Sequence, residues 1–298
     1  MSVLVDTLFS VTSLLNMNKP EGMYLCADYR TTDADTGIFI DDERVKHLTV
    51  HYPGDLKALI AFTGIAALKD GTPVGDWLME TMRGHTEVFD VSMAHLHSRL
   101  KRDFETYRRH LIVTVNVMDG NGRRGFGGFT NQRPSGYISR DFGYTMEELP
   151  EPRGFASGAP AAKAEAEKRF EVIKSQLKVK PRHAREHMNM LAKVNRRVAQ
   201  ADERRARATR VDGAIGTVSP FCHVSFVPAP GENTTKYPPE DRVYTLPGDG
   251  VEPPFAWPML VNGIDTRYQI ERLMAWARDG GEYIFDPEEA QRRLNRRP

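Results

Sequence analysis

The sequence contains little cysteine and no long, uninterrupted hydrophobic run. Its 298 residues include only two cysteines, Cys26 and Cys222, and each lies within an apolar stretch. We therefore expect buried, reduced thiols in a cytoplasmic protein and not the disulfide framework of a secreted one. No stretch approaches the ~20 consecutive apolar residues that span a bilayer, and residues 1–17 lack the basic leading segment of a signal peptide. No membrane association is expected.

A strong excess of charge of either sign is also missing. The formal net charge is +1, with 27% charged and 40% hydrophobic residues. This balance is typical of a globular protein and gives the whole molecule no bias toward nucleic acid or an anionic membrane. A chain of 298 residues can also bury a substantial core without disulfide support.

Strand signals and helix signals occur in blocks along the chain. Short β-rich segments separated by turns predict strands within residues 11–63, which suggest one sheet. Apolar residues at three- and four-residue spacing predict helices at 74–83 and 91–108. Strand signals return within 111–157, where a glycine-rich loop is predicted at 119–129 and a second sheet is expected.

Two further helices and one strand complete this pattern. Residues 159–176 and 183–210 are rich in helix-favouring Ala, Lys, Glu and Arg, and residues 218–227 read as a strand. This order does not alternate strand and helix as a parallel doubly wound sheet does. It predicts an α+β fold, a four-layer αββα sandwich of two stacked antiparallel sheets flanked by helices.

The final quarter of the chain differs from the rest in composition. Residues 228–257 hold clustered prolines and glycines and predict irregular structure, while 265–278 and 287–296 predict helices. We therefore expect a sandwich domain over residues 1–227 and a C-terminal extension over 228–298.

Four short motifs occur in an order that is known from one enzyme family. An apolar run at residues 23–30 ends in Ala-Asp-x-Arg, and Asp-Glu-Arg-Val-Lys-His-Leu follows at 42–48. Phe-Thr-Gly-Ile-Ala-Ala stands at 62–67 and Gly-Phe-Ala-Ser-Gly-Ala at 154–159. Together they resemble the proteasome β-subunit and HslV branch of the Ntn (N-terminal nucleophile) hydrolases, over roughly residues 11–227. The resemblance implies the αββα sandwich, a homo-oligomer and no cofactor or metal.

The resemblance also implies threonine chemistry on a peptide or amide substrate. Counting back from Asp28 without gaps places the nucleophile on Thr12, whose own α-amino group would act as the base after N-terminal processing. Asp28 would orient a nearby lysine, and a backbone N–H at Ser157-Gly158 would hold the oxyanion.

The expected lysine position is occupied by Arg44, a guanidinium that stays protonated and cannot exchange a proton with the nucleophile. Lys46 lies two residues further along the predicted strand, on the same face, and is the alternative. Two further residues depart from the family pattern: Val11 precedes Thr12 where glycine is usual, and Ala159 replaces a serine. An inactive, proteasome-like scaffold or assembly subunit is therefore the second hypothesis.

Other chemical features have simpler explanations. His223 has no second Cys or His at metal-ligand spacing and is interpreted as a structural histidine. Residues 163–210 contain 15 Lys and Arg against 6 Asp and Glu, which is typical of a solvated helical face. A third hypothesis makes this basic layer a docking site for nucleic acid or an acidic protein, although no aromatic residues are interleaved to stack bases.

Overall fold

The computed structural model describes most of the chain between residues 13 and 280. The described residues are 13–32, 39–41, 45–85, 88–107, 109–133, 135, 137–157, 171–208, 216–231, 237, 239–244, 259–261 and 264–280.

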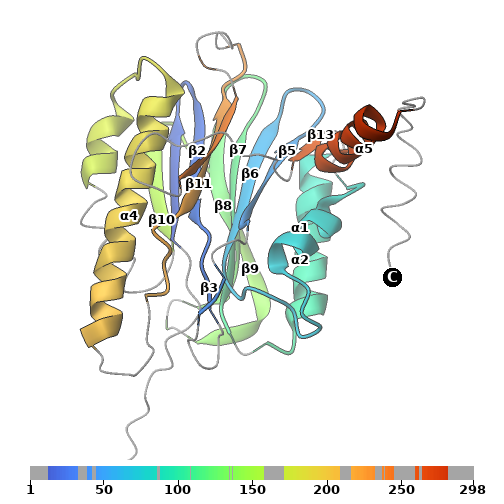
Figure 1. The fold of residues 1–298 in the computed structure, drawn as a ribbon, viewed down its shortest axis with the longest axis vertical. Coiled ribbons are helices and arrows are strands. Elements are labelled where there is room, and N and C mark those ends of the chain that lie inside the picture. The colour runs from blue at the N-terminus through green and yellow to red at the C-terminus, as the bar shows by residue number, and fades with distance from the viewer. Residues whose placement is uncertain are drawn as a thin grey trace, which may run out of the picture.

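Two large sheets form the centre of the molecule (Figure 1). The five-stranded sheet is antiparallel and contains, in spatial order, β10 (Arg153–Ser157), β1 (Leu14–Lys19), β2 (Gly22–Asp28), β11 (Cys222–Pro228) and β12 (Glu240–Tyr244). The seven-stranded sheet contains β14 (Ile264–Asp265), β13 (Met259–Val261), β5 (His47–His51), β6 (Lys57–Gly64), β7 (Leu111–Met118), β8 (Arg124–Gln132) and β9 (Ile138–Glu148). Strands β3 (Thr31–Thr32) and β4 (Phe39–Asp41) pair antiparallel in a separate two-stranded sheet.

Helices cover the outer face of each sheet. Helix α4 (Ala184–Ala208) packs on the five-stranded sheet, whereas α1 (Val74–Met82) and α2 (Phe89–Phe104) pack on the seven-stranded sheet, as Figure 1 shows. Helix α5 (Thr266–Asp279) lies beside β13. The layers therefore follow the expected αββα order, and the predicted fold class is confirmed. No helix within the described ranges is long and apolar enough to cross a membrane.

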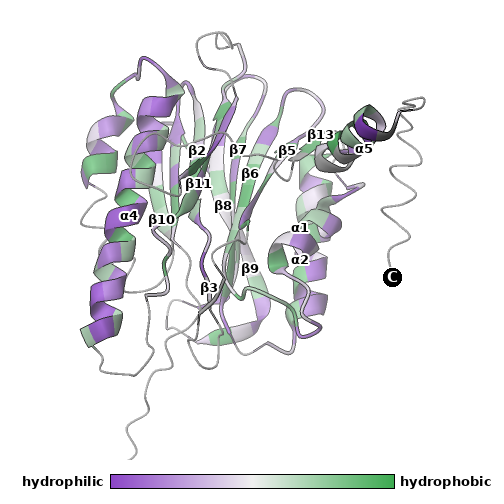
Figure 2. Ribbon diagram, in the orientation of Figure 1, coloured by the Kyte–Doolittle hydropathy of each residue, from purple (hydrophilic) through white to green (hydrophobic). Residues whose placement is uncertain are grey.

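Successive side chains of a strand point to opposite faces of its sheet, and the apolar side chains form three packing layers. In β2, Tyr24 and Cys26 belong to the apolar cluster under α4, while Leu25 and Ala27 belong to the cluster between the sheets. This is the two-residue period of a strand that is buried on both faces. Figure 2 shows the complementary pattern in α4, which is largely hydrophilic with hydrophobic residues interspersed where the helix packs on the sheet.

The expected grouping of strands into sheets is wrong in one respect. The strands within residues 11–63 do not form one sheet, because β1 and β2 pair with β10 and β11 whereas β5 and β6 pair with β7. Pairing partners lie far apart in the sequence, so local strand signals could not reveal this division.

The loop predicted at 119–129 is shorter than expected, because strand β8 starts at Arg124. Two glycines of β8 are required because the neighbouring strands approach their backbone closely. A Cβ on Gly127 would clash with the Thr145 carbonyl oxygen, and Gly128 has φ +145° and would clash through a Cβ with the Val113 carbonyl oxygen. Glycine therefore permits the strand here, although glycine clusters ordinarily indicate a loop.

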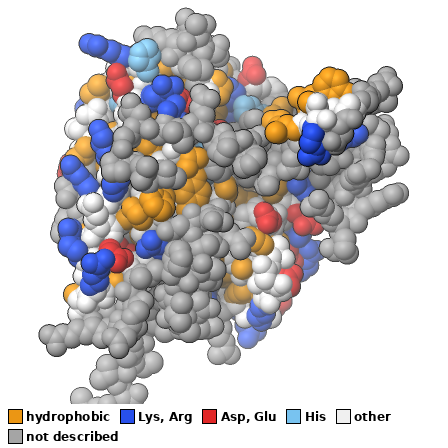
Figure 3. Space-filling view, in the orientation of Figure 1, with side chains coloured by type: hydrophobic (Ala, Val, Ile, Leu, Met, Phe, Trp, Pro, Cys, Tyr) orange, Lys and Arg blue, Asp and Glu red, His pale blue; other side chains and the backbone are white. Residues whose placement is uncertain are grey.

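The segment after residue 227 contributes strands to both sheets. Residues 240–244, expected to be irregular, form β12 against β11, and β13 pairs in parallel with β5. Helix α5 has apolar side chains that are exposed to solvent, namely Ile270, Leu273, Met274 and Trp276. Figure 3 shows hydrophobic atoms, in orange, on the surface at the position of this helix.

Candidate functional site

Asp28, the last residue of β2, is the centre of a buried polar site. One carboxylate oxygen accepts a hydrogen bond from the backbone N–H of Ser13 at 2.8 Å, and the other accepts from Ser219 at 2.9 Å and Arg30 at 3.1 Å. The backbone N–H of Asp28 donates in return to Ser13 O at 3.2 Å. The carboxylate thus holds three chain segments together at the end of the sheet.

Lys46 reaches this carboxylate from the other sheet. Its Nζ lies 3.3 Å from Asp28 Oδ1 and donates to the Arg30 carbonyl oxygen at 2.5 Å. The two side chains are nearly inaccessible, with 3% of Lys46 and none of Asp28 exposed. A buried ion pair of this kind persists only with further hydrogen bonds, which the three N–H donors to Asp28 provide.

Burial raises the pKa of Asp28 above its ordinary value, and the charge of Lys46 and the N–H groups of Ser219 and Ser13 oppose that rise. The carboxylate therefore depends on its partners to remain ionised in this environment. Removing Lys46 would favour the protonated form of Asp28. A protonated carboxyl group is neutral and cannot orient a cation by its charge.

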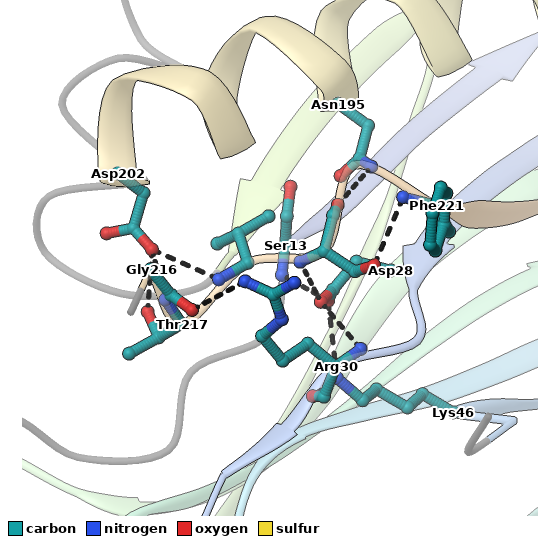
Figure 4. Close-up of polar contacts among 11 residues, drawn as sticks. Ser13, Asp28, Arg30, Lys46, Asn195, Asp202, Gly216, Thr217 and Phe221 are labelled. Atoms are coloured by element: carbon teal, nitrogen blue, oxygen red, sulfur yellow. Dashed lines mark hydrogen bonds and ion pairs between the residues drawn. The ribbon is translucent and has the colours of Figure 1, made fainter. Parts of the chain in front are cut away.

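The segment at residues 216–219, which follows α4 in the chain, forms another side of the site (Figure 4). Asp202 accepts hydrogen bonds from the backbone N–H groups of Thr217 at 2.5 Å and Val218 at 3.0 Å. Arg30 donates to Gly216 O at 2.8 Å, and Asn195 donates to Ser219 O at 3.0 Å. These contacts fix the segment whose Ser219 N–H binds Asp28.

The residues predicted as a catalytic set fall into two groups. Asp28 and Lys46 are in direct contact, and Ser157 lies on β10 with its backbone opposite Leu14 of β1. Thr12, Arg44 and Gly158 lie outside the described residues.

Sequence reasoning missed the supporting residues of this site. The roles of Asn195 and Asp202 depend on how α4 packs over the sheet, and no sequence spacing links them to Asp28. Both are single polar residues within a long, largely polar helix, so their residue types alone could not have identified them.

No protein-family model and no curated protein sequence matches this chain. Among solved structures, it is similar to the helical assembly of the Anbu complex from Pseudomonas aeruginosa, with 11% identity and TM-score 0.47, covering 92% of this chain and 98% of that one. Anbu (ancestral beta-subunit) from Yersinia bercovieri has 10% identity and TM-score 0.46, covering 92% and 99%. An Anbu (Gly-1) mutant from Hyphomicrobium sp. strain MC1 has 9% identity and TM-score 0.46, covering 92% and 100%.

These comparisons correct the family suggested by the sequence motifs. The similar structures are Anbu proteins, which are proteasome-like but distinct from the proteasome β-subunit and HslV branch. In this chain Ala-Asp-x-Arg stands at the end of β2, and a short motif of this kind is too unspecific to separate one family from another. The arrangement that the structure shows is an α+β sandwich of two stacked sheets flanked by helices.

Proposed function

We propose that this protein is a threonine-type Ntn hydrolase that cleaves a peptide or other amide bond. Thr12 would be the nucleophile once residues 1–11 have been removed. The observation that carries the proposal is the buried contact between Lys46 and Asp28, 3.3 Å apart, beside the backbone N–H of Ser13. That N–H belongs to the residue immediately after Thr12 in the sequence.

The chemistry uses the free α-amino group of Thr12 as the general base. This amine takes the hydroxyl proton while the oxygen attacks the substrate carbonyl carbon. The resulting tetrahedral intermediate expels the amine product, which receives the proton, and leaves an ester on Thr12. Water, activated by the same amine, then hydrolyses the ester and releases the acid product.

Lys46 would support this cycle electrostatically. A positive charge near the amine disfavours its protonated form, and it also favours the developing negative charge on the hydroxyl oxygen. Asp28 and the Arg30 carbonyl oxygen hold the ammonium in one position. We assign this role to Lys46 and not to Arg44, because the Lys46 contact with Asp28 is the one that supports it.

Stabilisation of the oxyanion is assigned to a backbone N–H at Ser157-Gly158. Strand β10 carries Ser157 directly alongside β1, opposite Leu14, which brings Ser157 to the strand that follows Thr12 in the sequence. Backbone donors suit this role because they are fixed before the reaction and need no reorganisation.

Intact-mass spectrometry combined with a peptide-amide hydrolysis assay tests the proposal. We expect a species that begins at Thr12, turnover that Thr12→Ala abolishes, and partial activity in Thr12→Ser. Thr7→Ala is the matched control, because it alters another threonine of the same N-terminal stretch and should leave turnover intact. A chain that retains Met1 or Ser2 and hydrolyses no substrate would refute the proposal.

The same result would favour the second candidate, an inactive scaffold or assembly subunit. The observation behind this candidate is Val11, since its side chain hinders the strained backbone geometry that glycine allows at a processing site. A Val11→Gly variant distinguishes the two. Release of Thr12 in this variant alone would indicate a site that is competent but blocked by residue 11.

Self-association is a further expected property. The exposed apolar side chains of α5, Leu273 and Met274 among them, form a surface of the kind that oligomers cover. Light scattering coupled to size-exclusion chromatography measures the assembly directly. A monomer at all concentrations would contradict the homo-oligomer prediction.

A further inference from the structure

Two histidines and an aspartate from three different strands meet between the sheets. His47 begins β5 of the seven-stranded sheet, while His223 on β11 and Asp241 on β12 belong to the five-stranded sheet. One ligand atom from each side chain lies within 4.8 Å of the other two. The rings of His47 and His223 have their centroids 4.2 Å apart and are tilted by 31°.

Ser225 lies at the centre of this group. Its hydroxyl oxygen is 2.6 Å from His47 Nε2 and 3.4 Å from His223 Nε2, and it donates a hydrogen bond to Asp241. His223 Nε2 is also 3.1 Å from Asp241 Oδ1. Four polar side chains from both sheets therefore converge on one small volume.

A network of hydrogen bonds alone can satisfy these groups. His47 would donate from Nε2 to Ser225, Ser225 to Asp241, and His223 from Nε2 to Asp241. In that state each imidazole carries its proton on Nε2. Binding of a metal requires the opposite tautomer, because both Nε2 lone pairs must face the ion. The two states are therefore distinguishable and compete for the same atoms.

We propose that His47, His223 and Asp241 bind a divalent transition-metal ion such as Zn²⁺, with the Ser225 hydroxyl or a water as the fourth ligand. Two imidazole nitrogens and one carboxylate oxygen are a donor set that zinc uses in proteins. No single strand carries more than one of these three ligands, which is why ligand spacing in the sequence gives no signal.

The required adjustment of the site is small. Zinc binds nitrogen and oxygen at about 2.0–2.2 Å in a tetrahedron, so its ligands lie about 3.3–3.6 Å from one another. The donor atoms lie within 4.8 Å of one another, so each separation would have to shorten by at most about 1.5 Å. Burial also lowers the pKa of both histidines, which leaves neutral imidazoles with lone pairs to share.

The cluster is open to solvent on the side of Asp241, so a metal ion could enter there and then be held by buried ligands. His223 is fully buried, whereas 35% of the Asp241 side chain is exposed, so solvent reaches the cluster at the carboxylate. An ion bound here would join β5 to β11 and β12 and would thus tie the two sheets together. The cluster shares no residue with the Asp28–Lys46 pair, although His47 directly follows Lys46 in the chain.

Calorimetric titration of metal-free protein with Zn²⁺ tests this inference. The full-length chain is first dialysed against EDTA, and the wild type is expected to bind one ion per chain. Asp241→Asn should lower the affinity at least about tenfold, the lower end of the loss caused by removing even an outer-shell partner of a metal site. Co²⁺ provides a second probe, because tetrahedral coordination by the wild type would give visible absorption bands.

A surface histidine pair provides the matched control. His85 and His95 stack with centroids 3.7 Å apart and are a plausible adventitious site for the same ion. His95→Asn should leave the stoichiometry and the affinity unchanged. If His95→Asn removes binding, or if Asp241→Asn binds as tightly as the wild type, the assignment is overturned.

A thermal readout keeps the test independent of misfolding. The amide side chain introduced by Asp241→Asn retains a carbonyl oxygen for the existing hydrogen bonds, so the metal-free melting temperature should stay close to that of the wild type. A hundredfold excess of Zn²⁺ over Kd should raise the wild-type melting temperature by about 5 °C and that of the variant by much less. Failure of the wild type to bind or respond would leave the hydrogen-bonded network as the correct description.

Discussion

The two faces of each sheet have different chemistry. The outer faces, under the helices, are filled by apolar side chains such as Leu96 and Leu100 on α2 and Leu191 and Val198 on α4. The layer between the sheets combines a smaller apolar cluster with polar contacts that cross from sheet to sheet. Among the described residues these include Lys46–Asp28, His47–Ser225, Asn116–Asn16, Asn18–Gly125 and Lys57–Pro228.

This difference separates what stabilises the fold from what can carry function. Apolar burial provides the larger part of the folding free energy and is non-directional. Buried polar groups must be paired in specific geometry, and they are costly when a partner is lost. We therefore expect changes under the helices to alter stability and changes between the sheets to alter chemistry.

The largest effect is expected from Lys46. If the proposed chemistry is correct, Lys46→Ala should lower amide hydrolysis by about 100-fold or more, the scale of a lost acid–base or electrostatic group. Lys57→Ala is the matched control, because Lys57 also reaches the other sheet, through a 3.3 Å contact with Pro228 O, but does not contact Asp28. Equal losses in both variants would show that cross-sheet packing, and not the ion pair, matters.

A change under the helices should act on stability instead. Leu100 is fully buried between α2 and the seven-stranded sheet, and Leu100→Ala should lower the free energy of unfolding by about 2–5 kcal/mol. Urea denaturation measures this change. Val91→Ala, at a position of the same helix that is 60% exposed, should change stability by less than about 0.5 kcal/mol. A small loss at Leu100 would contradict the division between the layers.

An uncharged pair between the sheets gives a smaller effect. Asn116 donates from its side-chain amide to Asn16 Oδ1 at 2.6 Å, and both residues are buried. Asn116→Ala should cost about 1–3 kcal/mol, because a buried polar partner loses its hydrogen bond. The double variant Asn16→Ala/Asn116→Ala should cost less than the sum of the two single changes. Strict additivity would mean that the pair is not coupled.

The smallest effect is expected at His187, which belongs with Lys19 and Glu21 to a polar group in the otherwise apolar layer under α4. Burial, and then the charge of Lys19, lower the pKa of His187 to about 4, and Glu21 lies nearby at 4.0 Å. The unfolded chain, with a histidine pKa near 6.5, therefore binds the proton first as the pH falls. Stability should be fully present above pH ~6.5 and should decrease toward pH ~4.

The contribution of His187 to this loss is about 1–2 kcal/mol after allowance for solvent screening. His187→Asn should flatten the pH profile of the denaturation midpoint, measured in metal-free buffer. Val172→Ala, at an exposed position, should leave the profile unchanged. A profile as steep in His187→Asn as in the wild type would assign the acid sensitivity to other groups.

Much of the fold could be predicted from the sequence because local signals were strong. Helix α4 forms almost where the helix-favouring composition of residues 183–210 predicts it, and α1 follows the prediction at 74–83. The sheet division could not be predicted, since it depends on which distant strands pair. The extent of β8 was missed because glycine usually indicates a loop, whereas here it allows the Gly127 backbone to approach Thr145.

The candidate site shows the same limit. The compact motif Ala-Asp-x-Arg points to Asp28, and strand geometry makes Lys46 an alternative to Arg44 because it lies two residues further along. The structure then brings Lys46 to Asp28. His47, His223 and Asp241 come from three strands in two sheets, and only three-dimensional pairing brings them together.

The parallel pairing of β13 with β5 has a consequence for synthesis. Leu260 sits opposite Val50, so the open edge of a strand made early is closed by residues made more than two hundred positions later. A ribosome-bound nascent chain would therefore display the backbone of residues 49–51 unprotected until nearly the whole polypeptide has emerged. An exposed strand edge invites pairing with other chains. Premature termination before residue 259 should thus yield aggregates.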